Sequence, residues 1–103
     1  MATGRLFAAG IPATTNTAVY TVPASKTGSL SLNLCNTTSA QIKVRIALAA
    51  SGTPVDGEYI EYDTAIPANG VLERGVIVLA ATQNVVIYAA SVGINATGWG
   101  FEE

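Results

Sequence analysis

Histidine is absent from this 103-residue sequence, and cysteine occurs only once. Without histidine the chain has no Ser–His or Cys–His pair and no imidazole base. Glycine-rich phosphate motifs and the Cys/His spacings of metal sites are missing as well. We therefore expect a protein that is not an enzyme and that has no catalytic residue, no cofactor and no metal ligand.

The single cysteine, Cys35, excludes an intrachain disulfide. It lies among apolar residues of an expected strand, and no lysine or arginine is found within several residues of it. A reactive thiol needs a nearby base or cation that lowers its pKa. We expect Cys35 to be a buried and inert thiol.

Long hydrophobic runs and clusters of one charge are also missing. No stretch approaches the ~20 apolar residues of a membrane span, and the N-terminal residues contain no run long enough for a secretion signal. The net charge is −2, with no basic run. These features predict a chain with no membrane partner and no nucleic-acid partner.

Charged residues are scarce altogether, at 12% of the chain against a usual ~25%. A small domain has much surface for its volume, so few charges leave a surface made of small neutral groups. Such a surface is poorly protected against association and suits a chain that packs against copies of itself or a partner. The alternative is an ordinary soluble domain with a surface rich in threonine and serine.

The strongest pattern that is present lies at residues 41–50 (QIKVRIALAA). Ile42, Val44, Ile46 and Leu48 alternate with Gln, Lys, Arg and Ala, which is typical of a strand with one buried face. Other strands are expected at residues 18–22, 29–36, 58–66, 71–79, 85–92 and 95–101, and residues 1–9 are a first strand or an N-terminal arm. The polar residues 36–39 predict a hairpin between 29–36 and 41–50.

Seven to eight short strands at a spacing of about 8–12 residues are typical of an antiparallel sandwich. We therefore predict an all-β fold, a single antiparallel β-sandwich of jelly-roll or Ig-like type that forms one domain over residues 1–103.

Two of these strands, at 76–79 and 85–90, have no polar face. Both of their faces are covered within the domain, or one is covered by another subunit. Near the C-terminus two glycines alternate with two aromatic residues, and glycines permit the close approach of another backbone. The resulting interface candidates are Val76, Val78, Val86, Tyr88, Gly98, Trp99, Gly100 and Phe101.

Carboxylates are the remaining candidates for chemistry. Strand parity places Glu61 and Asp63 on one face with Tyr59, and Glu58 on the other. Two carboxylates in a cleft suit glycoside hydrolysis, and oxygen ligands in a loop suit Ca²⁺, but the sequence has no Ca²⁺-binding loop motif. Exposed carboxylates that solvate one face are the simpler interpretation.

The aromatic residues and two glycosylation-type triplets have simple interpretations too. A sugar-stacking platform is one interpretation of Tyr59, Tyr62, Tyr88 and Trp99, but their scatter over three strands favours core and interface packing. The Asn-X-Thr triplets at 36–38 and 95–97 are interpreted as turn residues, since no secretion signal is seen.

Several segments resemble a family of small β-domains found in virion structural proteins of tailed bacteriophages. The matching pieces are residues 20–27 (YTVPASKT), 34–36 (LCN), 42–48 (IKVRIAL), 59–75 (YIEYDTAIPANGVLERG) and 100–103 (GFEE). Ser25 stands where the family usually has Gly, and Leu34 where it usually has Val. These motifs are structural and contain no catalytic groups.

The resemblance implies a non-enzymatic virion building block. We expect a protein that is made in the host cytoplasm and located in the virion, where it contacts other virion proteins. We expect a homo-oligomer, with a trimer as the expected state, that decorates the capsid as a cement protein. The alternative is a small tail, baseplate or fibre component that binds a host receptor or a glycan.

Overall fold

The computed structural model describes residues 3–103, which form eight strands and one short 3-10 helix. Their bounds, in chain order, are β1 (Thr3–Gly10), β2 (Thr17–Thr21), β3 (Gly28–Asn36), β4 (Ile42–Ala49), η1 (Asp56–Glu58), β5 (Tyr59–Ile66), β6 (Val71–Leu79), β7 (Asn84–Ala89) and β8 (Ile94–Glu102).

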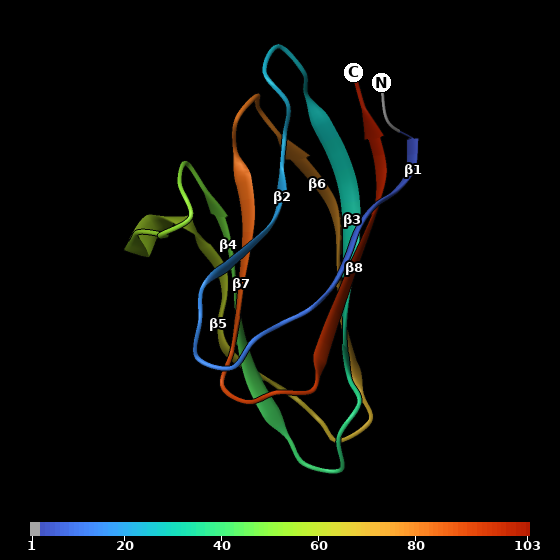
Figure 1. Cartoon of the computed structure of the whole chain (residues 1–103), viewed down its shortest axis with the longest axis vertical. Coiled ribbons are helices and arrows are strands. Elements are labelled where there is room, and N and C mark those ends of the chain that lie inside the picture. Colours follow the sequence, from blue (N-terminus) through green and yellow to red (C-terminus); the bar gives the residue numbers. More distant parts are fainter. Residues whose placement is uncertain (1–2) are drawn as a thin grey trace.

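The strands form two four-stranded antiparallel sheets that pack face to face (Figure 1). Sheet A has the order β1-β8-β3-β6, and sheet B has the order β2-β7-β4-β5. The chain changes sheet at every connection between strands except β4–β5. This is the strand order of an eight-stranded jelly roll, so the predicted all-β sandwich is confirmed and the jelly-roll alternative holds. Of the predicted first strand or arm at residues 1–9, the described part is a strand, because β1 pairs with β8 from Thr3 to Gly10, and residues 1–2 lie outside the described residues.

The predicted hairpin between β3 and β4 is wrong, because these strands lie in different sheets. The connection between them is folded onto the side chain of Asn36. The amide nitrogen of Asn36 donates to the Ala40 carbonyl, and its Oδ1 accepts from the backbone N–H and the hydroxyl of Thr38. These bonds hold the connection at the end of the sandwich, where it crosses to sheet B.

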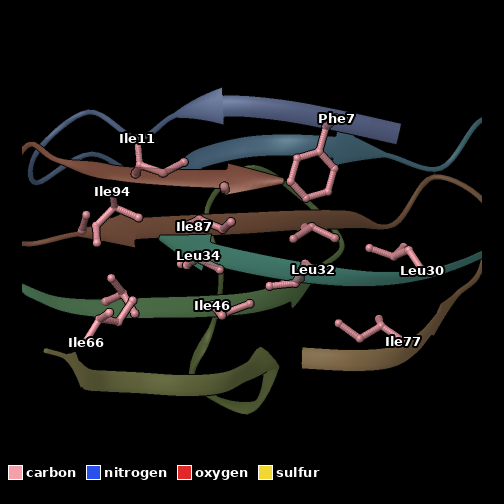
Figure 2. Close-up of a cluster of buried hydrophobic side chains, with 14 of the residues drawn as sticks. Phe7, Ile11, Leu30, Leu32, Leu34, Ile46, Ile66, Ile77, Ile87 and Ile94 are labelled. Atoms are coloured by element: carbon pink, nitrogen blue, oxygen red, sulfur yellow. The ribbon is translucent and has the colours of Figure 1, made fainter. Parts of the chain in front are cut away.

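The core fills the space between the sheets (Figure 2). Strand β3 alternates strictly between buried and half-buried residues, and its three leucines point inward. Opposite it, Ile42, Val44 and Ile46 of β4 are at most 3% exposed, which confirms the predicted alternation over residues 42–46. Ala47, which the pattern placed on the wet face, is instead buried under Tyr59 and beside Val86. At ~25 cal/mol per Å² of apolar surface, these inward rows are the main source of stability.

Every edge strand of the sandwich is interrupted by a β-bulge. The pairing register shifts once in β1 against β8, once in β2 against β7, once in β6 against β3 and twice in β5 against β4. The central pairs β3–β8 and β4–β7 show no shift. Bulges twist an edge away from regular pairing, so all four edges are poor templates for adding a further strand.

Candidate functional site

Four of the eight interface candidates lie together on the outer face of sheet A. Val76 is 76% exposed, Val78 65%, Trp99 42% and Phe101 41%. With Val71, which is 54% exposed at the same face, these residues are called here the apolar face. Five of the nine large hydrophobic side chains that are exposed in residues 3–103 belong to it, and such a concentration is typical of an interaction surface.

The two C-terminal glycines are not part of this outer face and lie against other parts of the same chain. A Cβ on Gly98 would overlap the ring of Phe7, and a Cβ on Gly100 would overlap the backbone carbonyl of Ser29. Gly100 also has a φ of +154°, which disfavours a side chain. The close approach that these glycines permit is therefore made within the chain, by a core ring and by the neighbouring strand. Trp99 and Phe101 point outward rather than into the core.

The remaining two candidates, Val86 and Tyr88, lie on the outer face of sheet B. Val86 is only 2% exposed, because it packs in a small cluster with Ala47, Ala49 and Tyr59. The apolar strand β7 is thus covered on both faces within the domain, whereas β6 keeps its outward valines exposed.

A trough runs along β3 in the middle of the apolar face. Its floor consists of the short side chains of Ser29 and Ser31, between Trp99 and Phe101 on β8 and the valines of β6. Two adjoining hollows of about 340 Å³ and about 160 Å³ lie along it, and Ser31, Val76 and Trp99 line both. We call this groove the serine trough. A third hollow, of about 400 Å³, lies beyond Val76 beside Leu48 and Ile60.

The margins of the apolar face have opposite charges. Arg5 on β1 is aligned with Trp99, and Glu73 on β6 is aligned with Asn33, so both point to the outer side of sheet A. Both side chains are exposed, and neither forms an ion pair among residues 3–103.

The predicted pairing of Glu61 and Asp63 on one face is wrong, because a bulge separates them. Tyr62 and Asp63 together stand opposite Arg45, and Asp63 has a φ of +53°. Asp63 therefore points outward and binds the Arg45 guanidinium at 2.7 Å. Glu61 forms an ion pair with Arg74 of β6 instead, which links the two sheets at their open edge.

Asp63, Glu58 and Glu61 each bind another group of the same chain through their carboxylates. The hydrogen bond from Arg45 holds the pKa of Asp63 below its ordinary value. Glu58 accepts the backbone N–H groups of Val55 and Ala50, which lower the pKa of its carboxyl. Glu61 also accepts the hydroxyl of Thr64 at 2.6 Å. Across residues 3–103, no group of three or more acidic or cysteine side chains is arranged to hold a metal ion.

The structure brings together tyrosines whose scatter along the sequence concealed their proximity. Strands β7, β4 and β5 are neighbours in sheet B, so Tyr88, Arg45 and Tyr62 form a row on its outer face. The guanidinium carbon of Arg45 lies 4.3 Å from the ring centre of Tyr62 and 4.6 Å from that of Tyr88. Tyr59 meets Tyr62 edge to face at 5.0 Å. We call these four residues, Arg45, Tyr59, Tyr62 and Tyr88, the tyrosine cluster. It could not be recognised from the sequence, because the order of the strands in sheet B brings its members together.

The LCN motif at residues 34–36 has a structural role. Cys35 is half-buried rather than buried, because its side chain points to the outer face of sheet A. Asn36 is 1% exposed, and its amide nitrogen already donates to the carbonyls of Ala40, Ile66 and Pro67. These bonds are consistent with the interpretation of residues 36–38 as a turn. The same interpretation of residues 95–97 is wrong, because they lie within β8 and pair with both β1 and β3.

No family model, no curated protein and no solved structure matches this chain. Within residues 3–103 there is no helix long and apolar enough to cross a membrane.

Proposed function

We propose that this protein is a non-enzymatic structural component of a tailed-bacteriophage virion, where it assembles through protein–protein contacts. Decoration of the capsid as a cement protein is the favoured role, and a small tail or baseplate component is the alternative. Its partners are copies of itself and other virion proteins. The proposal draws its phage context from the segments that resemble virion β-domains, several of which form structural turns and strand ends here.

The apolar face is the single observation that supports the proposal most. A jelly roll hosts many functions, so the fold alone does not decide between them. An exposed group of valines and aromatic residues on one sheet is costly for a monomer in water and is typical of a surface with a partner. The bulged edges favour contact through this face over extension of a sheet.

A non-enzymatic role agrees with the state of the polar groups. The chain has no histidine. Asp63, Glu61 and Glu58 are engaged in ion pairs or in hydrogen bonds that hold the β5 segment. These carboxylates therefore have structural roles. This agrees with a protein that acts by binding partners through its surface and not by chemistry at a polar site.

Mass spectrometry of purified phage particles, with copy number, tests the proposal. We expect the chain in the virion, at a copy number on the scale of the capsid lattice for a cement protein and on the scale of the tail rings for a tail component. Capsid shells without tails, analysed in parallel, separate the two locations. The absence of the chain from purified particles would overturn the proposal.

The tyrosine cluster supports the second candidate function, which is glycan or receptor binding. Tyr62 is 57% exposed beside the Arg45 guanidinium, and exposed aromatic faces stack on sugar rings. Titration of the protein with host surface polysaccharide, followed by tyrosine fluorescence, is the test. Binding that Tyr62→Ala abolishes and Val92→Ser retains would favour this candidate, and no response would exclude this surface.

A further inference from the structure

The apolar face contains a ridge and a groove of matching position. Trp99 and Phe101 form the ridge on β8, and the serine trough lies on the adjacent strand β3. In the pairing register Ser31 is aligned with Trp99, and Ser29 with Phe101. The ridge and the trough are therefore side by side, at the same level along the sheet.

The geometry points to a second copy of this chain as the partner of the apolar face, an inference that rests on the proposed assembly function. A two-fold axis along the seam between β8 and β3, parallel to the strands, exchanges the positions of these strands between two copies. The ridge of each copy then lies over the trough of the other, with the second copy's Trp99 over Ser31 and its Phe101 over Ser29. Two sheets packed in this way lie about 10 Å apart, in the aligned mode of sandwiches.

The charges at the margins obey the same symmetry. β1 and β6 are the two edges of sheet A, so three strand spacings, about 14 Å measured across the sheet, separate the strands of Arg5 and Glu73, and the two residues form no ion pair within one chain. The two-fold axis places β1 of one copy over β6 of the other. Glu73 is about one pleat, or about 7 Å, along the strand from the level of Arg5. An arginine side chain spans that distance, so the pair forms twice in the dimer.

The area of the apolar face determines how tightly the two copies are expected to bind each other. A sheet of four strands with up to nine residues each is about 19 Å by about 30 Å, which is several hundred Å² per copy. This area is at the low end for specific protein interfaces. We expect a dimer with a dissociation constant in the micromolar range.

Sedimentation velocity over a concentration series of the whole chain is the test. Val76→Ser and Val92→Ser form a matched pair, since these valines are 76% and 73% exposed and only Val76 lies on the apolar face. We expect Val76→Ser to weaken the dimer about tenfold and Val92→Ser to leave it unchanged. Equal effects of the two changes, or a monomeric wild type, would overturn the inference.

Charge reversal tests the symmetry itself. Arg5→Glu and Glu73→Arg each place like charges together twice in their own dimers, so each variant alone is expected to associate less than wild type. A mixture of the two variants restores both attractive pairs in the heterodimer, and the double variant restores them in the homodimer. Both changes are at exposed positions, and circular dichroism confirms that the variants are folded.

The outcomes separate this inference from the proposed function. A protein that is found in virions but is monomeric, or trimeric as the sequence predicted, refutes the two-fold pairing and leaves the function standing. A dimer whose charge-reversed variants fail to complement each other refutes the placement of the axis. A dimer that is absent from virions refutes the function alone.

Discussion

The buried amide of Asn36 offers a sharp test of what holds one end of the sandwich together. Its nitrogen donates to the carbonyl oxygens of Ala40, Ile66 and Pro67 at 2.8, 3.1 and 3.2 Å. The change Asn36→Asp keeps the shape and replaces this nitrogen with an oxygen. Three carbonyls that now accept a hydrogen bond would then face a carboxylate.

The loss of stability in Asn36→Asp has two causes, the lost hydrogen-bond donors and the new charge. A buried polar group without its partner costs about 1–3 kcal/mol, and Asn36 provides two N–H donors. Its side chain is 1% exposed, so water does not replace them. We expect Asn36→Asp to lower the free energy of unfolding by about 4 kcal/mol at neutral pH, a large part of the ~5–15 kcal/mol of a domain.

Urea unfolding at about pH 4 and at about pH 7 is the assay, because the loss depends on pH. Burial and the facing carbonyls raise the pKa of the new carboxyl above its unfolded value of about 3.9. A group with a raised folded pKa favours folding when it is protonated, at low pH, and this contribution is lost as the pH rises. The variant is therefore expected to be closest to wild type in acid.

Asn95→Asp is the matched control, because Asn95 is exposed on β8 and undergoes the same chemical change. We expect a change within about 0.5 kcal/mol for it. Equal effects of Asn36→Asp and Asn95→Asp, or a deficit of the Asn36 variant that grows in acid, would refute the reasoning.

Three further outcomes are expected. Ile46→Asp puts a carboxylate at a position with no exposure and should cost several kcal/mol in a denaturant titration, whereas Arg45→Ser should cost far less, because it removes only a solvent-screened ion pair and ring contacts. Gly98→Ala should lower the melting temperature because its Cβ overlaps a core ring, whereas Gly57→Ala, with open space around it, should not. The hydrogen bond from Arg45 lowers the folded pKa of Asp63 below 3.8, so its stabilising contribution is lost as the pH falls, and Asp63→Asn should flatten the acid limb of the melting-temperature profile.

The local pattern of the sequence predicted the strands, and where no bulge interrupts them it predicted the inward face. Ile42, Val44 and Ile46 alternate with polar residues, and the same three residues are buried in β4. Period-2 alternation is sufficient here because one face of each sheet faces water. The strand order was not accessible, because a jelly roll pairs strands that are far apart in the chain, such as β1 with β8.

A β-bulge explains why Glu61 and Asp63 were predicted to lie on the same face. Parity counting placed Glu61 and Asp63 on one face, and a single inserted residue in β5 reverses that assignment. The tyrosine cluster was missed for a related reason. Tyr62 and Tyr88 are on different strands, and only their common neighbour β4 brings them together through Arg45.

Strands β6 and β7 have similar apolar sequences but differ in the exposure of their outward side chains. Both strands contain an uninterrupted apolar run, and for both the pattern left two alternatives, a second face covered within the domain or one covered by another subunit. In sheet B the patch is closed by Tyr59, which packs on Val86. In sheet A no residue of 3–103 covers Val76 and Val78, so of the two apolar runs only the one in β6 leaves exposed valines. If a second copy covers that side of sheet A, the tyrosine cluster on the opposite sheet remains outward on both copies, where it is free to contact a different partner.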